Sequence, residues 1–281
     1  MVSNSPNSQQ LKTMLAFLCL VLHLVSAYGS ASKAKNIIIL AGQSNMSGRG
    51  GVQNNTWDGV VPLQSKPNRS ILRLTANLTW VEAREPLHKD IDFQVTCGVG
   101  PGMVFANRML QRDPSLGPLG LVPCAVGGPI GTKISEWGRG TFLYKQLVRR
   151  AKASRVGGGS IRGLLWYQGE SDTVSEMDAK MYKRRLLNLF NNLRSDLGSP
   201  SLPIVLVAIA SGNGPYVETV RKAQLGFKLQ KVRCVDAKGL PLLKDKRHLS
   251  TPAQVRLGRK LADAFLVQEH SASPSKDTSS P

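Results

Sequence analysis

The feature that most constrains the fold is a series of short apolar segments that alternate with longer amphipathic ones. The first, 36–42, is almost continuously apolar and ends at glycine, which is typical of a strand buried on both faces. Similar segments follow at 119–126, 163–168, 203–210 and, more weakly, 232–236. Parallel strands need helical crossovers, so the pattern predicts an α/β fold in three layers, with a parallel sheet of about five strands between helices.

Stretches with helical spacing lie between and after these segments. In the longest of them, Leu186, Phe190 and Leu193 recur on one face of a helix. Thr251 is a predicted N-cap of the final helix, with Pro252 at its first position. The predicted helices are 103–111, 142–153, 177–197, 216–229 and 252–266.

The length of 281 residues suits one such domain, which we place at 35–266. Residues 49–95 show little periodicity and are predicted to be an inserted loop region, a usual place for substrate contacts. Residues 267–281 are rich in serine and proline, which predicts a disordered tail. The residues before the domain need a separate explanation.

Residues 1–27 have the organisation of a secretory signal peptide. Lys12 precedes an apolar run at 14–25, and the small residues Ser26 and Ala27 follow it. A bilayer crossing needs about 20 apolar residues, so this run is short for an anchor, although a retained anchor is the alternative. We therefore expect a secreted, extracellular protein with no membrane contact after cleavage, the cleavage site being open.

Three cysteines remain once the signal is removed, Cys97, Cys124 and Cys234, in the oxidising compartment that export implies. They allow at most one internal disulfide and leave its pairing open, although a buried free thiol is the simpler interpretation for Cys124. Glycosylation sequons agree with export, and the one that adjoins Ser44 is expected to stay unmodified. The sequons begin at Asn45, Asn54, Asn68 and Asn77.

The net charge of +19 is the most unusual feature of the composition, and loss of Lys12 with the signal lowers it by one unit. The cations are dispersed, and the sequence has neither zinc-finger spacing nor an RNA-binding aromatic motif, so we expect no nucleic acid partner. Adhesion to acidic polysaccharide is the predicted role of the charge. A merely soluble basic surface is the alternative.

Residues that follow the predicted strands are the first catalytic candidates, because ligands of open parallel sheets bind at the carboxyl ends of strands. Ser44 comes directly after the first strand and after Gly42, which permits a sharp turn. Asp245 and His248 precede the last helix, at a spacing that lets the carboxylate hold one imidazole nitrogen and leaves the other as a base. A helix cap for Ser44, and ordinary surface positions for Asp245 and His248, are the alternatives.

Two further strand ends offer hydrogen-bond donors for a developing oxyanion. They are the backbone N–H of Gly127, with Gly128 as second choice, and the side-chain amide of Gln168. A tight turn at the glycines and a structural hydrogen bond for Gln168 are the alternatives. Glu170 is predicted to be a structural acceptor that supports the same loop.

Four segments of the chain together resemble the SGNH hydrolases. The closer resemblance is to the sialate O-acetylesterase-like (SASA) domain of plant carbohydrate esterases and of carbohydrate esterase family six. Segments 42–46, 166–170 and 245–249 resemble the nucleophile block, the W-x-Q-G-E block and the closing acid and base block. Segment 97–102 resembles the glycine-rich segment that precedes a helix. The resemblance covers about 35–266, with the blocks in family order.

The resemblance implies a flavodoxin-like three-layer fold and a serine esterase that releases acetyl groups from a carbohydrate. Ser44 is the implied nucleophile, His248 the base and Asp245 the orienting acid. The amides of Ser44 and Gly127 and the side chain of Gln168 are the implied oxyanion donors, and no metal or organic cofactor is needed. The implied substrate is an acetylated cell-wall polysaccharide or glycoside, and the implied location is the plant cell wall.

Two departures from the family pattern bear on function. Pro129 stands where relatives usually have Thr or Ser after the paired glycines, and Lys246 and Arg247, between acid and base, could bias the site toward acidic polymers. The first departure keeps open a catalytically idle relative that binds polysaccharide. A lipase-type serine esterase is the other alternative.

Overall fold

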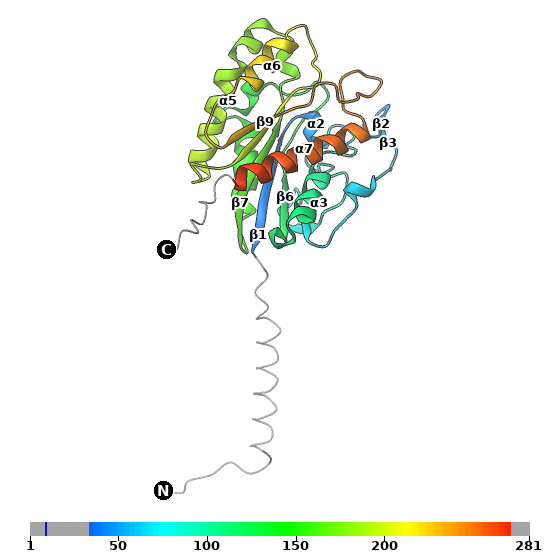
Figure 1. Cartoon of the computed structure of the whole chain (residues 1–281), viewed down its shortest axis with the longest axis vertical. Helices are drawn as coiled ribbons and strands as arrows, with labels where there is room; N and C mark the ends of the chain where they lie inside the picture. The colour runs from blue at the N-terminus through cyan, green and yellow to red at the C-terminus, as the bar shows by residue number, and fades with distance from the viewer. Residues whose placement is uncertain (1–8, 10–33, 271–281) are drawn as a thin grey trace, which may run out of the picture. The chain divides into compact units, whose positions relative to one another are not determined.

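A seven-stranded sheet forms the centre of the domain in the computed structural model, which describes residue 9 and residues 34–270 (Figure 1). The predicted signal peptide, 1–27, lies outside the described residues apart from residue 9, as does 271–281. The strands of the sheet are β1 (Lys35–Gly42), β4 (Ile71–Leu74), β5 (Trp80–Glu82), β6 (Leu119–Pro123), β7 (Gly159–Tyr167), β8 (Ile204–Ala208) and β9 (Val232–Asp236).

The strand order is β5-β4-β6-β1-β7-β8-β9, and every neighbouring pair is parallel except the antiparallel β4 and β5. The five long strands therefore have the order 2-1-3-4-5 along the chain, which is the flavodoxin-like arrangement. The order reverses at β1, whose neighbours β6 and β7 both follow it in the chain. In such sheets the ligand crevice lies at the carboxyl end of the strand where the order reverses.

The helices cover both faces of the sheet, as β7 shows. Gly163 lies against the ring of Phe265 in α7, whereas Trp166 packs edge-on against Phe190 in α5, with ring centroids 6.1 Å apart. Residues separated by an odd number in a strand point to opposite faces, so α7 and α5 lie on different sides of the sheet. The helices are α2 (Ser44–Ser47), α3 (Gly102–Arg112), α4 (Phe142–Ala153), α5 (Glu176–Asp196), α6 (Val217–Leu225) and α7 (Thr251–His270).

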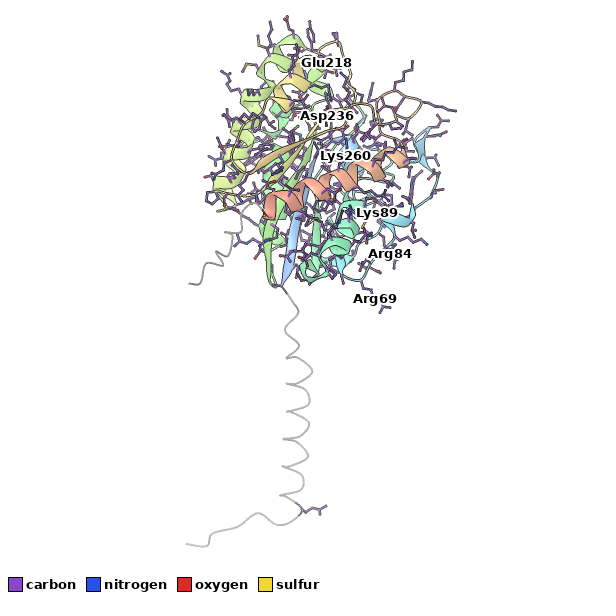
Figure 2. All side chains as sticks on the ribbon, in the orientation of Figure 1. Arg69, Arg84, Lys89, Glu218, Asp236 and Lys260 are labelled. Carbon is purple, nitrogen blue, oxygen red and sulfur yellow. The ribbon has the colours of Figure 1, made fainter. Side chains whose placement is uncertain are left out.

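The predicted α/β class and the five long strands are confirmed, but residues 49–95 are not simply a loop. They contain β4 and β5, which extend the sheet beyond the predicted five strands, and a small hairpin of β2 (Val52–Gln53) and β3 (Thr56–Trp57). Strands of two to four residues are too short to show a period in the sequence. Ile71 and Leu74 of β4 are nevertheless fully buried, while Arg69, Arg84 and Lys89 project from the surface nearby (Figure 2).

The C-terminal boundary also needs correction. The tail was expected from residue 267, but α7 continues to His270. α6, by contrast, ends at Leu225, before Gly226, rather than at residue 229. Glycine is a poor helix residue, and its position sets this end of α6.

The thiols of Cys97, Cys124 and Cys234 are all free, and the first two are buried, as expected for Cys124. The domain therefore has no disulfide among its described residues. Within residues 34–270, no helix is long and apolar enough to cross a membrane.

The contact between α3 and α7 should carry much of the stability of one face. Phe265 is 2% exposed and packs edge-on against Phe105, with ring centroids 5.8 Å apart. We expect F265A to lower the free energy of unfolding by about 3–5 kcal/mol, because it removes a buried ring and leaves a cavity. Urea denaturation measures this, with R259A on the exposed face of α7 as the control. An equal effect of both substitutions would contradict the packing described.

Candidate active site

Ser44 stands at the carboxyl end of the central strand, as the first residue of α2. Gly42, with φ +127°, makes the turn between β1 and α2, and a side chain there would collide with the carbonyl oxygen of Tyr167 in β7. Only glycine satisfies both conditions. The turn therefore places the Ser44 hydroxyl above the sheet where the strand order reverses.

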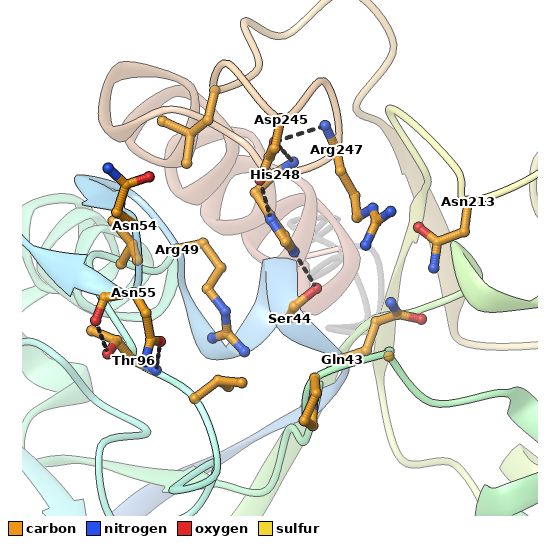
Figure 3. Close-up of a pocket in the computed structure, with 16 residues that line it drawn as sticks. Gln43, Ser44, Arg49, Asn54, Asn55, Thr96, Asn213, Asp245, Arg247 and His248 are labelled. Carbon is orange, nitrogen blue, oxygen red and sulfur yellow. Dashed lines mark hydrogen bonds and ion pairs between the residues drawn. The ribbon is translucent and has the colours of Figure 1, made fainter.

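The loop before α7 brings Asp245 and His248 to the same place (Figure 3). Asp245 Oδ1 accepts hydrogen bonds from the backbone N–H groups of Arg247, at 2.8 Å, and His248, at 3.0 Å. Asp245 Oδ2 lies 2.6 Å from His248 Nδ1, and His248 Nε2 lies 3.0 Å from Ser44 Oγ. The structure thus joins the three residues predicted as nucleophile, base and acid into one hydrogen-bonded chain.

The pKa values of the acid and base suit this arrangement. Burial alone would raise the pKa of Asp245, but hydrogen bonds from the backbone of His248 and Arg247 and from the His248 ring outweigh it and hold that pKa below its ordinary value. Burial lowers the pKa of His248 despite the opposing charge of Asp245, and the charges of Arg49 and Arg247 add to this lowering. His248 is therefore neutral at neutral pH and able to accept a proton.

A buried amide holds the serine and histidine segments together. The Asn45 side chain is fully buried, and its Oδ1 accepts from the backbone N–H of Leu249 at 2.9 Å. Its Nδ2 donates to Glu170 Oε1 at 2.7 Å and to the carbonyl oxygen of Arg247 at 3.4 Å. Glu170 thus acts as the structural acceptor that was expected. The burial of Asn45 also leaves no room for a glycan at this sequon in the folded protein.

Gly127 lies against the nucleophile, and its N–H is hydrogen-bonded to a carboxylate. A side chain at Gly127 would put its Cβ 2.7 Å from that of Ser44, so only glycine fits here. The N–H groups of Gly127 and Gly128 donate to Asp92 Oδ2, at 3.1 Å, and Asp92 Oδ1, at 2.9 Å. Both amides are thus engaged by Asp92 in the structure, and their role as oxyanion donors stays a prediction.

Asp92 belongs to a buried ionic network that sequence reasoning missed. Its Oδ2 also lies 2.6 Å from Arg49 Nη2 and accepts from Ser47 Oγ at 2.8 Å. Burial would raise the pKa of Asp92, but the charge and hydrogen bonds of Arg49 outweigh it, so the carboxylate stays ionised. Arg49 and Asp92 lie near the two ends of 49–95, the region expected to be a loop, and neither residue belongs to a recognisable sequence motif. The network ties α2 to the Gly127 turn.

Gln168 also differs from its expected role. The side chain is fully buried at the end of β7, and its Nε2 donates to the carbonyl oxygen of Thr132 at 2.7 Å and to Asp172 Oδ2 at 2.6 Å. Asp172 is itself buried, which raises its pKa to about 7, and Gln168 supplies one of its hydrogen bonds. The Gln168 amide is thus engaged in the structure, as in the structural alternative.

A cavity of about 210 Å³ opens at Ser44 and His248. Ten of its sixteen lining residues have polar or charged side chains, and the region at 49–95 supplies part of the lining. Among the described residues no cluster of three or more His, Cys, Asp and Glu side chains is placed to hold a metal ion. The lining residues are Gln43, Ser44, Arg49, Val52, Asn54, Asn55, Val95, Thr96, Gly128, Pro129, Gly131, Asn213, Leu243, Asp245, Arg247 and His248.

Comparison with solved structures identifies proteins of similar fold. A solved structure of a protein from Xanthomonas citri, described as a carbohydrate acetylesterase, has a TM-score of 0.58 and 16% identity, covering 84% of this chain and 57% of its own. At that identity it shows a shared fold alone. The X-ray structure of protein At4g34215 from Arabidopsis thaliana has a TM-score of 0.79 and 54% identity, covering 83% of this chain and 98% of its own.

Sequence comparison shows the family to which the chain belongs. The Arabidopsis thaliana protein described as "Probable carbohydrate esterase At4g34215" is 56% identical over 237 residues, which are 82% of this chain and 90% of that protein. The family model described as "Carbohydrate esterase, sialic acid-specific acetylesterase" matches residues 34–267. The chain therefore belongs to this carbohydrate esterase family, and it is a carboxylic ester hydrolase.

Proposed function

We propose that the chain removes acetyl groups from an acetylated carbohydrate, with Ser44 as nucleophile, His248 as base and Asp245 as orienting acid. The observation that carries the proposal is the continuous contact from Asp245 Oδ2 through His248 to Ser44 Oγ, with links of 2.6 and 3.0 Å. These are distances for hydrogen bonding and proton transfer. A relay of this kind also favours an active enzyme over an idle binding relative.

The reaction proceeds in two steps. His248 Nε2 takes the proton of Ser44 Oγ while the oxygen attacks the acetyl carbonyl, and the protonated ring then gives that proton to the departing sugar hydroxyl. A water molecule, deprotonated by His248, next attacks the acetyl group on Ser44, which frees acetate and restores the serine. Asp245 stabilises the charged ring in both steps and stays ionised itself.

The Ser44 N–H is the oxyanion donor that we assign. It is the first amide of α2 and has no partner within that helix. The Gly127 N–H can contribute only by exchanging Asp92 for the oxyanion, since it already donates to that carboxylate. The Arg49 guanidinium, which also lines the cavity, adds positive charge beside it.

A carbohydrate suits the cavity better than a lipid does. Asn54, Asn55, Thr96 and Asn213 line it and offer amide and hydroxyl groups to sugar hydroxyls. A long acyl chain would need a continuous apolar wall, whereas the apolar side chains of this cavity, those of Val52, Val95, Pro129 and Leu243, are interspersed with polar ones in the chain segments that line it. The lipase-type alternative is therefore disfavoured.

Replacement of the nucleophile tests the proposal most simply. We expect S44A to lower kcat/KM for p-nitrophenyl acetate by about three to six powers of ten, because no other group can form the acetyl-enzyme. The exposed residue Ser201 provides the control, and S201A should retain wild-type activity. Circular dichroism and thermal unfolding should match in all three proteins. Retention of activity in S44A would exclude the proposed nucleophile.

The lowered pKa of His248 gives a second prediction. Only the neutral ring accepts the serine proton, so kcat/KM should fall as pH drops through the pKa of His248, which lies below the ordinary 6.5. Once the pH is high enough for the ring to be neutral, kcat/KM should stay level up through neutral pH. A pH series from about 4 to about 8, with the fold followed in parallel by circular dichroism, measures the midpoint. A midpoint above 6.5 would contradict the assignment.

We further propose that the chain is exported and secreted, on the strength of the leader at 1–27. The sequon at Asn77 lies exposed in the turn between β4 and β5, where a glycan can be attached without disturbing the fold. Expression of the full chain with a C-terminal fluorescent tag should place it outside the cell, with a new N-terminus near residue 28. Uncleaved protein in the cytoplasm would contradict export.

A further inference from the structure

Arg247 lines the cavity, and its guanidinium forms no ion pair among the described residues. Its charge does reach the buried carboxyl of Glu170, where it opposes the rise in pKa that burial causes. Of the other charged residues that line it, Arg49 is paired with Asp92 and Asp245 is paired with His248. Within residues 34–270, no acidic side chain pairs with the Arg247 guanidinium, and the residue is exposed. The rim of the site therefore offers one cation whose guanidinium is not taken up by an ion pair within the described domain.

The main chain of Arg247 is fixed against the catalytic groups. Its carbonyl oxygen accepts from Ser211 Oγ at 2.6 Å and from Asn45 Nδ2 at 3.4 Å, while its N–H donates to Asp245 Oδ1 at 2.8 Å. In the view of Figure 3 its side chain extends between His248 and Asn213, on the side of the cavity that holds Ser44. The base of this side chain is therefore fixed beside the catalytic loop, so a ligand held by the guanidinium would lie close to the nucleophile.

The positive charge of Arg247 acts on the catalytic base, His248. It adds to the lowering of the His248 pKa that burial dominates, so it lies within electrostatic reach of the base. Asp245 is the only carboxylate among the lining residues, and it faces His248. A negative ligand group would thus meet attraction from Arg247 with little repulsion from the cavity wall.

We propose that Arg247 binds a carboxylate of the carbohydrate, and hence that the substrate is an acidic, O-acetylated glycan built with uronic acids. This inference rests on the proposed function, because it deepens the specificity of the same site. Guanidinium groups bind carboxylates through two parallel hydrogen bonds, and lysine does not reproduce that geometry. The net charge of +19 would attract such a polymer at longer range.

The carboxylate could belong to the acetylated sugar itself or to a neighbouring sugar. O-acetylated galacturonan oligosaccharides supply the first arrangement, and O-acetylated glucuronoxylan oligosaccharides supply the second. Each is compared with the same material after its carboxylates have been converted to neutral amides. The ratio of kcat/KM for the carboxylated and amidated forms then isolates the contribution of the negative charge, and acetate release is the signal.

We expect the wild type to prefer the carboxylated form of at least one pair by roughly ten-fold, the size expected for a charge-assisted hydrogen bond. R247Q should bring that ratio close to one, and R247K should restore part of it. K246Q, at an adjacent exposed cation that does not line the cavity, is the matched control and should keep the wild-type ratio. A wild-type ratio of one for both pairs, or an unchanged ratio in R247Q, would overturn the proposal.

A second measurement does not depend on any variant. Sodium glucuronate should inhibit wild-type hydrolysis of p-nitrophenyl acetate more strongly than glucose does, and added salt should weaken that inhibition. Equal inhibition by the two sugars at low salt would contradict a carboxylate site. Failure of the esterase proposal itself would look different, because no acetate would then be released from any substrate, including p-nitrophenyl acetate.

Discussion

The buried side chain of Asn45 is the contact on which the candidate site depends. Ser44 and His248 are 204 residues apart in the chain, and no disulfide within the described domain joins their segments. Asn45 reaches from the nucleophile helix to the backbone of Leu249, and its amide nitrogen reaches Glu170 at the end of β7. One buried amide thus fixes the base relative to the nucleophile, in surroundings where an unmade hydrogen bond is costly.

The ionic network around Asp92 has a similar role on the other side of Ser44. Its carboxylate receives hydrogen bonds from α2 and from the Gly127 turn, so two segments that meet at the nucleophile share one buried anion. Loss of either partner would leave an uncompensated charge in the interior. The network also engages the amides of Gly127 and Gly128, which lie next to the nucleophile or the cavity.

The sequence predicted the features that rest on long periodic segments or on strand ends. β1 is apolar from Ile37 to Ala41, and Ser44 follows its carboxyl end, as predicted. The four residues of β4 were too few to show a period, so the sheet was expected to be smaller than it is. For Gln168 the sequence left an oxyanion role and a structural hydrogen bond both open, because it does not show that Asp172 is buried beside the amide and accepts from it. Asp92 has no motif at all, and only the folded chain shows what it binds.

The central claim is that the Ser44 hydroxyl, activated by His248, forms a covalent intermediate. A serine-directed organophosphorus ester such as diethyl p-nitrophenyl phosphate tests this directly, because it phosphorylates an activated serine. After digestion, mass spectrometry of the wild type should find the adduct on Ser44 in proportion to the activity lost, and H248A should react far more slowly. Loss of activity with the adduct on another residue, or equal labelling in H248A, would contradict the account.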